Sequence, residues 1–266
     1  MSPRAARVCL SGARGRMGQL LAGFLQRADD LALGAALERP GHPDLGLDLG
    51  GGVRLGDEPR AALEASDALL DFGPPASVLE HAELAARLGR PVVTGTTGFD
   101  AAQMEALRAL GARVAVLQSA NMSRGVFLLT DLARQAAALL GPEFDAEILE
   151  LHHRGKADAP SGTALRLAEA LEAASGRGPT RANRQGARQA GEVGLASIRG
   201  GDVVGEHQIM FLGPGEQLVL THRALNREHF CRGALDALRF IVRARPGFYG
   251  MGDVFGPGGG AAGGGP

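Results

Sequence analysis

Short apolar runs alternate with helical patterns over the first half of the chain, and this alternation constrains the fold more than any other feature. Strands separated by helices of about 10 to 15 residues are typical of βαβ units with parallel strands. The alternation therefore predicts an α/β domain with a parallel sheet. The expected strands lie at 8–10, 31–38, 67–72, 91–95 and 113–118, and the expected helices at 20–25, 76–88 and 101–110.

The pattern changes after Asn121. Two of the later strands alternate apolar with polar residues, which is typical of a sheet with one solvated face, so we expect a second α+β domain with a mixed or antiparallel sheet. A last helical pattern at 229–242 can return to the first domain. The expected helices lie at 126–140 and 161–174, and the expected strands at 147–153, 194–199, 206–211 and 217–222.

These patterns divide the chain into a first domain at 1–122, completed by 227–266, and a second domain at 123–226. Two other stretches lack periodicity. Residues 40–52 are rich in Gly and Pro and are expected to form a loop, and the glycine-rich tail at 256–266 is expected to be disordered because it cannot bury apolar surface.

Composition narrows the possible partners. The 266 residues carry a formal net charge of −1, which gives no electrostatic footprint for nucleic acid or a membrane surface and favours a small-molecule ligand. The two cysteines, Cys9 and Cys231, lie in apolar patterns and suit packing in a reducing compartment. No apolar run reaches the roughly 20 residues of a membrane span and no leader opens the chain, so we expect a soluble cytoplasmic protein.

A glycine loop follows the first strand and opens the first helix. Gly12, Gly15 and Gly18 form G-x-x-G-x-x-G, a variant of the dinucleotide-binding fingerprint of Rossmann-like domains. Glu38 ends the second strand, where an acidic residue can bind the ribose hydroxyls, and the adjacent Arg39 can accept a 2′-phosphate. The pair leaves the choice between NAD and NADP open, and an ordinary glycine turn with a solvated charge pair is the alternative.

Two further segments follow strands of the same expected sheet. Because parallel sheets bind ligands at the carboxyl ends of their strands, Gly95–Thr97 and Ser119–Ser123 are expected near the nicotinamide half of the nucleotide. Arg16, at the start of the first helix, can meet the pyrophosphate. Each segment is also compatible with a plain turn and helix cap.

The densest polar cluster contains Lys156, the one lysine among 28 basic residues. An ammonium is compact and its pKa is easily moved by neighbours, so this placement favours a chemical role. His152 and His153 end a strand and should point to opposite faces, and either is a candidate proton donor. Ser161 is a candidate N-cap, and Gly162 would let a carboxylate approach the helix amides. No Cys or acidic residue recurs at ligand spacing, so no metal is expected.

The chain resembles the bacterial dihydrodipicolinate reductase family, nearly from end to end. The most specific segment is ELHHRGKADAPSGTA at 150–164, since the glycine loop is shared with many dehydrogenases. The other matching segments are GARGRMG at 12–18, Glu38-Arg39, GTTGFD at 95–100, SANMSRGV at 119–126 and IRGGDVVGEHQIMF at 198–211.

The resemblance implies hydride transfer from NADH or NADPH to a cyclic imine dicarboxylate, 4-hydroxy-tetrahydrodipicolinate or dihydrodipicolinate. The product is tetrahydrodipicolinate, in the diaminopimelate route of lysine biosynthesis. The resemblance also implies a nucleotide-binding domain at 1–122, completed by 227–266, and a substrate-binding and oligomerisation domain at 123–226. The oligomer it implies is a homotetramer built through the sheet of the second domain.

The same resemblance assigns roles to individual residues. His152 matches the proton donor and Lys156 a second catalytic donor, while substrate-binding positions correspond to His153, Gly162 and Thr163. Two positions depart from the family pattern, since Arg14 adds a charge to the glycine loop and Met122 stands where Phe is frequent. The implied cofactor-binding residues are Gly12, Ala13, Arg14, Gly15, Arg16, Met17, Glu38, Arg39, Gly95, Thr96, Thr97, Ser119, Ala120, Asn121 and Met122.

Two other functions remain open on the same fold. One is an NAD(P)-dependent amino acid dehydrogenase acting on aspartate or a diamino acid. The other is a sensor that binds NADPH without turnover, against which the presence of both His152 and Lys156 argues.

Overall fold

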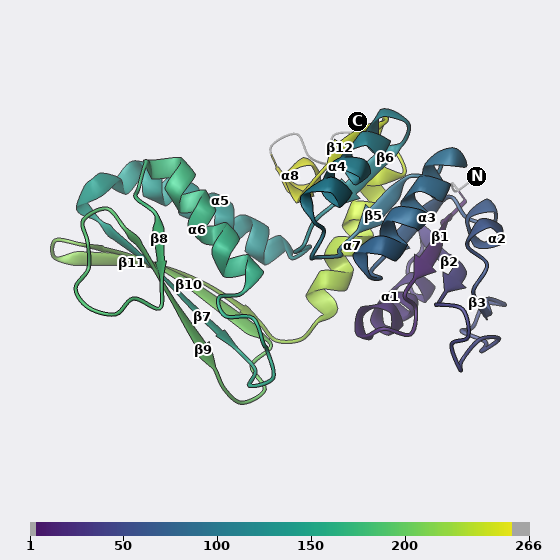
Figure 1. Cartoon of the computed structure of the whole chain (residues 1–266), viewed down its shortest axis with the longest axis horizontal. Helices are drawn as coiled ribbons and strands as arrows, with labels where there is room; N and C mark the ends of the chain where they lie inside the picture. The colour runs from purple at the N-terminus through teal and green to yellow at the C-terminus, as the bar shows by residue number, and fades with distance from the viewer. Residues whose placement is uncertain (1–3, 257–266) are drawn as a thin grey trace. The chain divides into compact units, whose positions relative to one another are not determined.

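The computed structural model describes residues 4–256, which form two compact units. The first comprises residues up to Met122 and those from Glu228 onward, and the second spans Ser123–Arg227. Figure 1 labels the helices and strands of both units. Of the tail at 256–266, expected to be disordered, residues 257–266 lie outside the described residues.

The first unit is built on a seven-stranded sheet in which every strand pair is parallel, in the order β12-β6-β5-β4-β1-β2-β3. The predicted Rossmann-like parallel sheet is confirmed. The strands are β1 (Ala6–Ser11), β2 (Leu31–Leu37), β3 (Leu55–Gly56), β4 (Ala68–Asp71), β5 (Val92–Thr94), β6 (Ala115–Gln118) and β12 (Gly247–Tyr249).

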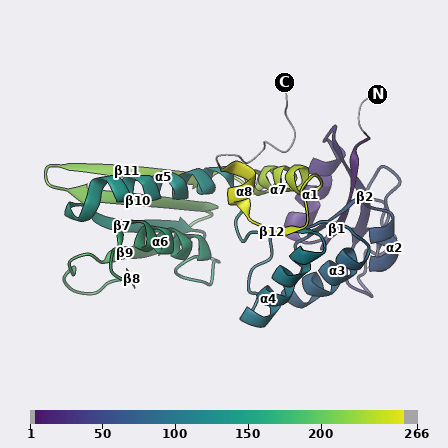
Figure 2. The same cartoon turned by 90° about the horizontal axis from the view of Figure 1, so that it is seen from above.

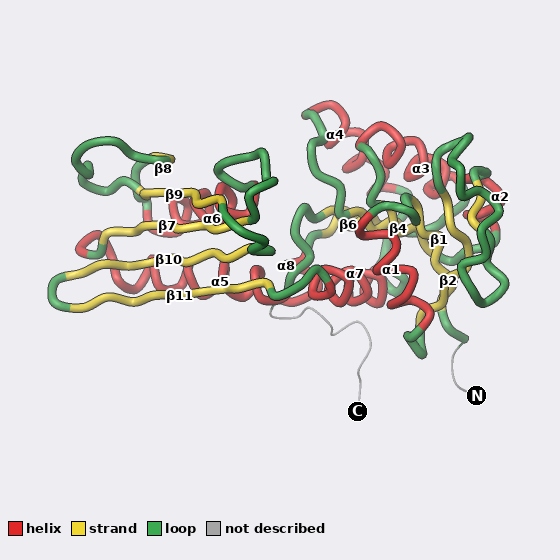
Figure 3. Tube along the Cα trace, turned by 90° about the horizontal axis from the view of Figure 1, so that it is seen from below, coloured by secondary structure: helices red, strands yellow, loops and turns green. Residues whose placement is uncertain are grey.

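Helices cover both faces of this sheet. In Figures 2 and 3, α1 and α7 lie on one face and α3 and α4 on the other. Because both faces of the sheet are covered, Val8–Leu10 and Val92–Val93 have no exposed surface. Strands buried in this way have continuous apolar sequences. The helices are α1 (Arg16–Gln26), α2 (Pro59–Glu64), α3 (Pro75–Arg87), α4 (Ala101–Ala109), the 3₁₀ turn η1 (Leu110–Ala112), α7 (Glu228–Ile241) and α8 (Met251–Phe255).

Four short elements of this unit have no counterpart in the sequence-based expectations: β3, α2, β12 and α8. Elements of two to six residues are too short to display a period of 2 or 3.6, and β3 and β12 are edge strands that exist only through pairing with β2 and β6. The two cysteines pack as expected. Burial raises the pKa of the Cys9 thiol to about 12 and that of Cys231 to about 11, so both are unreactive core residues.

The second unit contains a five-stranded sheet in the order β11-β10-β7-β9-β8. β7 pairs antiparallel with β10 and parallel with β9, so the predicted mixed sheet is confirmed. The strands are β7 (Asp145–His152), β8 (Thr180–Ala182), β9 (Val193–Arg199), β10 (Gly205–Gly213) and β11 (Glu216–Ala224). The helices are α5 (Arg124–Leu140), the 3₁₀ turn η2 (Gly141–Glu143) and α6 (Gly162–Ser175).

Both α5 and α6 lie on one face of this sheet (Figure 3). Alternate residues of β7 face them, and the first two, Ala146 and Ile148, are buried in an apolar core with Ile209 and Phe211 of β10. The same alternation then brings Glu150 and His152 to this face. The apolar core therefore gives way to polar side chains at the carboxyl end of β7.

Among the described residues, no helix combines the length and hydropathy required to span a bilayer.

The glycine loop yields a prediction about stability. A Cβ at Gly18 would lie 2.1 Å from the Gly12 carbonyl oxygen, whereas one at Gly23 of the same helix would meet only the flexible end of Arg27 at 3.3 Å. We expect Gly18→Ala to lower the free energy of unfolding by about 2 kcal/mol or more through forced backbone movement. Gly23→Ala should leave it unchanged or raise it by up to about 1 kcal/mol, because alanine favours a helix.

Thermal unfolding followed by circular dichroism compares the two variants with the unmodified chain. Equal Tm values for Gly18→Ala and Gly23→Ala would contradict the close packing of α1 on the loop.

Candidate active site

The loop between β1 and α1 has the geometry of an anion site. Gly12 has φ +70°, a left-handed conformation that glycine adopts without strain, and its carbonyl accepts a hydrogen bond from the Gly15 amide at 3.0 Å. Gly15 is the N-cap of α1 but has no side chain with which to cap it, and no acidic residue lies in the first turn. The first-turn amides and the helix dipole are therefore suited to a diphosphate. The exposed Arg16 lies at this end of the helix.

Glu38 lies directly after β2 and is tied to the glycine loop. Its Oε2 accepts a hydrogen bond from the Arg14 amide at 3.2 Å, and its Oε1 accepts one from the Arg39 amide at 3.2 Å. The Arg14 guanidinium donates to Asp44 Oδ2 at 2.6 Å, so the additional charge in the loop is offset by a carboxylate. Arg16 and Arg39 are both exposed.

The segment after β5 combines tightly packed residues with one exposed side chain. A Cβ at Gly95 would lie 2.1 Å from the Phe72 ring, so glycine is required there by the protein itself. Thr96 is buried and its hydroxyl donates to the Gly73 carbonyl at 2.8 Å, which joins the loops after β4 and β5. Thr97 is exposed and is the residue of this segment whose side chain faces solvent most openly.

The segment after β6 is held by its own hydrogen bonds. The Ser119 hydroxyl donates to the Asn121 carbonyl at 2.7 Å and accepts from the Asn121 amide at 3.3 Å, and Ala120 lies half-buried between them. The Met122 side chain is buried, and a Cβ at Gly233 would lie 1.6 Å from the Met122 carbonyl oxygen. Met122 is therefore packed in the interior of the first unit.

A buried aspartate and a histidine form a pair near these loops. The sequence reasoning missed this pair. Asp71 ends β4 with no exposed surface, and its Oδ2 lies 2.7 Å from His81 Nδ1 of α3. The other carboxylate oxygen accepts from the Gly73 amide at 2.7 Å, and Ser11 Oγ lies 3.2 Å from His81 Nδ1. The pair thus joins the ends of β1 and β4 to α3.

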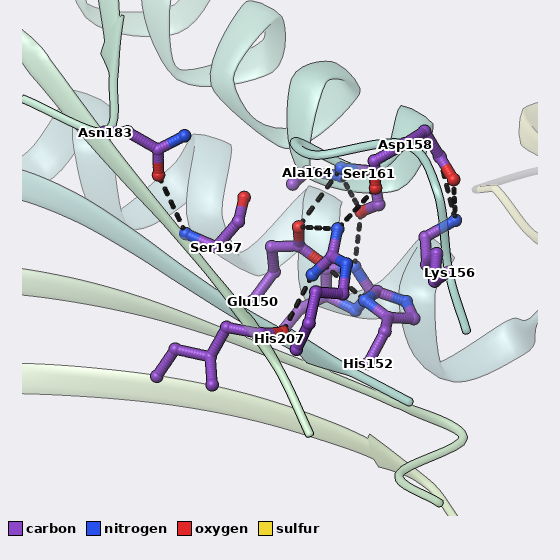
Figure 4. A network of polar contacts seen from close by, with 11 residues as sticks. Glu150, His152, Lys156, Asp158, Ser161, Ala164, Asn183, Ser197 and His207 are labelled. Atoms are coloured by element: carbon purple, nitrogen blue, oxygen red, sulfur yellow. Dashed lines mark hydrogen bonds and ion pairs between the residues drawn. The ribbon is translucent and has the colours of Figure 1, made fainter. Parts of the chain in front are cut away.

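The second unit contains a network of polar contacts at the carboxyl end of β7 (Figure 4). Glu150 has no exposed surface, and its Oε2 contacts His152 Nδ1 at short range. The other oxygen, Oε1, accepts from the Arg199 guanidinium at 2.7 Å and from the Ser161 amide at 3.2 Å. The His207 ring lies edge-on to the His152 ring, with centroids 5.2 Å apart, and its Nε2 is 3.3 Å from Ser161 Oγ.

The charges of this network determine its protonation. Burial raises the pKa of the Glu150 carboxyl, but the Arg199 hydrogen bond and the charges of His152 and Arg199 outweigh burial and hold that pKa below its usual range. Burial lowers the pKa of His152, although Glu150 opposes this change. Burial and the nearby His152 lower the pKa of His207 to about 4. At neutral pH, Glu150 is ionised and His207 is neutral.

Lys156 lies in the turn after β7, where its amide donates to the His153 carbonyl at 3.1 Å. This turn ends β7 at His152, one residue before the expected end, and leaves His153 outside the strand. The Lys156 ammonium donates to both oxygens of Asp158 at 2.8 Å, and this hydrogen bond lowers the pKa of the Asp158 carboxyl (Figure 4). Asp158 is exposed, so the ammonium lies at the surface of the network.

The start of α6 forms the other side of this network. Ser161 is its N-cap, as predicted, and Ser161 Oγ accepts from the Ala164 amide at 3.2 Å. Gly162 is exposed, and a Cβ there would meet no protein atom within 4 Å. Protein packing therefore does not require glycine at 162, whereas close approach of a ligand to the helix amides would. Thr163 is the next residue of the same first turn.

Three donor atoms of Glu150, His152 and His207 lie within 4.8 Å of one another, a spacing that a metal ion could bridge. Their other partners do not suit a cation. Arg199 already neutralises Glu150, and the ammonium of Lys156 acts on both histidines. The donor set therefore fits an internal hydrogen-bond network better than a metal centre.

Sequence reasoning missed Glu150, Arg199 and His207 as members of the site. A signal existed for Glu150, because residues two apart on a strand share a face and Glu150 precedes His152 by that spacing. No comparable signal existed for the other two, since His207 is paired with Glu150 only through the antiparallel register of β10, and Arg199 with His152 through the parallel register of β9.

Comparison with known proteins now identifies the family. Residues 6–122 match the model of the dihydrodipicolinate reductase N-terminus, and residues 125–255 match that of the C-terminus. The chain belongs to the dihydrodipicolinate reductase family. It is 44% identical to the 4-hydroxy-tetrahydrodipicolinate reductase of Roseobacter denitrificans, over 94% of this chain and 97% of that protein. The family consists of oxidoreductases that use NADH or NADPH.

Solved structures agree with this assignment. The dipicolinate-bound dihydrodipicolinate reductase from Paenisporosarcina sp. TG-14 superimposes with a TM-score of 0.79 at 26% identity, covering 93% of this chain and 98% of that one. An amine dehydrogenase from Mycobacterium smegmatis superimposes with a TM-score of 0.60 at 15% identity, covering 92% and 95% of the two chains. The second similarity shows a shared fold alone.

The buried His207 generates a prediction about pH. Its pKa in the folded chain, about 4, lies below the unfolded value, so the unfolded chain binds more protons between these values and stability falls as the pH falls. We expect this residue to destabilise the second unit by about 2 kcal/mol between pH 7 and pH 5.

Urea unfolding at both pH values measures the effect, with His207→Gln for comparison. The variant should lose part of the pH dependence, and an unchanged dependence would show that His207 is not buried in its neutral form.

Proposed function

We propose that this chain reduces 4-hydroxy-tetrahydrodipicolinate or dihydrodipicolinate to tetrahydrodipicolinate in the diaminopimelate route of lysine biosynthesis, as a cytoplasmic enzyme that uses NADH or NADPH. The family match over both units carries this proposal. The network around His152, with an ammonium and a helix N-terminus beside it, is chemically consistent with a dicarboxylate substrate that must be protonated.

The first unit would hold the nucleotide. The Gly12–Met17 loop would bind the diphosphate, and Glu38 the ribose hydroxyls, with Arg39 beside a 2′-phosphate when one is present. Gly95–Thr97 and Ser119–Met122, at the carboxyl ends of β5 and β6, would border the nicotinamide. When bound, the reduced nicotinamide supplies a hydride. Every other requirement of the reaction falls to residues of the chain.

The second unit would hold the substrate and supply the proton. Reduction of a conjugated imine leaves an electron-rich enamine, and one of its carbons must take up a proton. His152 is the proposed donor because one ring nitrogen is held by Glu150 while the ring keeps some exposure. We propose that Lys156 and the Gly162–Thr163 turn bind the two carboxylates of the substrate and that His153 makes a further contact.

We also propose a homotetramer assembled through the open face of the five-stranded sheet. Figure 3 shows α5 and α6 on one face only. The other face carries apolar side chains that are well exposed in the single chain, with Ile198 at 47%, Val219 at 44% and Leu212 at 38%. Apolar side chains exposed on a sheet face that no helix covers suit an interface with another subunit.

A coupled assay tests the proposal. A dihydrodipicolinate synthase supplies the substrate, and oxidation of NADPH or NADH is followed by absorbance. No substrate-dependent oxidation with either nucleotide would overturn it. Aspartate and diamino acids with NAD⁺ or NADP⁺ form a second arm of the assay. Turnover there alone would favour an amino acid dehydrogenase.

Two substitutions test the catalytic residues. His152→Gln should lower kcat by at least about a hundredfold while changing substrate KM little, because general acid catalysis contributes on this scale. Lys156→Arg keeps the charge but replaces a compact ammonium with a planar fork and should lower kcat/KM at least about tenfold.

Arg154→Lys, the reverse exchange at an exposed position two residues away, is the matched control and should leave kcat/KM unchanged. Full turnover in Lys156→Arg would remove the argument for a special lysine, and a His152→Gln variant that loses only affinity would assign His152 to binding.

Arg39→Ala tests nucleotide recognition. Loss of the exposed guanidinium should weaken NADPH binding about tenfold or more and leave NADH binding nearly unchanged, because only NADPH carries the 2′-phosphate. The fluorescence of each bound nucleotide measures its Kd directly. Equal losses for both nucleotides would exclude a role for Arg39 in phosphate recognition.

A further inference from the structure

We propose that Glu150 and Gly205 are positioning residues that hold the His152 imidazole with Nδ1 bound to a carboxylate and Nε2 open for proton transfer. The inference rests on the proposed function in that it takes His152 as the proton donor. It adds two residues to the site, neither of which is expected to touch substrate.

Glu150 determines which nitrogen of His152 carries a fixed proton. Its Oε1 is committed to the Arg199 guanidinium and the Ser161 amide, and its Oε2 contacts His152 Nδ1 (Figure 4). An ionised carboxylate can only accept hydrogen bonds, so Nδ1 must donate. Nε2 is then the nitrogen that exchanges a proton with the substrate.

Gly205 leaves room beside His152 Nε2 because it has no side chain. It lies at the start of β10, and a Cβ there would lie 3.0 Å from His152 Nε2 and 3.3 Å from Cδ2. Contacts this close would push the ring away from Glu150 or cover Nε2. The backbone of Gly205 does not have a positive φ, so the absent side chain is the reason for glycine.

The charged and titratable groups around His152 come from three strands and the following turn. Glu150 lies on the same strand, Arg199 on β9, His207 on β10 and Lys156 in the turn. His222 of β11 acts on His207, and Asp158 is paired with Lys156. Glu150 is the group that opposes the effects of burial and of the cations on His152, so its loss would lower the pKa of His152 further.

The proton step balances on this arrangement. The Nε2–H bond of imidazolium breaks, its electron pair stays on Nε2, and a C–H bond forms from the enamine electron pair of the substrate. The imidazole becomes neutral with its remaining proton on Nδ1 facing Glu150. Solvent protonates Nε2 again before the next turnover. The substrate is reduced and the nicotinamide nucleotide is oxidised, so no further reactant is needed.

Glu150→Gln is the direct test. Since protonated His152 is required, activity falls as the pH rises through its pKa, and this fall should move to lower pH by about one unit in the variant. At pH 7, kcat should drop at least about tenfold while substrate KM changes less than threefold. The ¹⁵N NMR signals of His152 in the ligand-free protein should change from the Nδ1–H to the Nε2–H tautomer, because the glutamine amide can donate to Nδ1.

Glu147→Gln is the matched control. Glu147 lies on the same strand and is also paired with arginine, in its case Arg184 and Arg188, but it faces away from His152. The control should leave the pH profile and the tautomer unchanged even if stability falls. Gly205→Ala should lower kcat with an unchanged fold by circular dichroism, and Glu150→Asp should restore part of the wild-type pH profile.

An unchanged pH profile and an Nδ1–H tautomer in Glu150→Gln would overturn the proposal. If that variant does not fold, Glu150→Asp and Gly205→Ala decide, and wild-type kcat in both would overturn it equally. The NMR measurement needs no turnover. A tautomer change in a protein without reductase activity would therefore separate failure of the proposed function from failure of this inference.

Discussion

The second unit depends on one buried carboxylate. Glu150 has no contact with solvent, and an ionised group can occupy such a position only when its charge and its hydrogen bonds are matched. Arg199 of β9, His152 of β7 and the Ser161 amide supply these partners. The same three contacts hold the His152 ring, join β7 to β9 and fix the start of α6. Removing one partner would leave a buried charge, so these elements are coupled energetically.

The physical reason for glycine differs from one position of the two sites to another. Gly18 and Gly95 are required by the protein, because a Cβ would strike the Gly12 carbonyl or the Phe72 ring. Gly162 meets nothing within 4 Å, so packing of the protein does not require glycine there. Motif matching treats the three alike. Only the space around each position separates a packing glycine from one that leaves room for a ligand.

Lys156 acquires a partner that the sequence did not single out. Both oxygens of Asp158 accept from its ammonium, while Asp158 remains exposed. A substrate carboxylate would compete with Asp158 for this ammonium, and a compact cation on a flexible stem can exchange one carboxylate for another more readily than a bidentate guanidinium can. This exchange gives a physical reason for lysine in a chain whose other long basic side chains are arginine.

The sequence alone determined the features that depend on neighbouring residues. The alternation of strands and helices, the glycine loop after β1 and the Ser161 cap all follow from spacings of a few positions, where propensity and hydrogen bonding are local. Only the tertiary structure decided which residues of other strands join the network of Glu150 and His152. His207 and Arg199 reach this network through strands far along the chain, and the antiparallel and parallel registers that align them are set by packing of the sheet against α5 and α6, which no local pattern encodes.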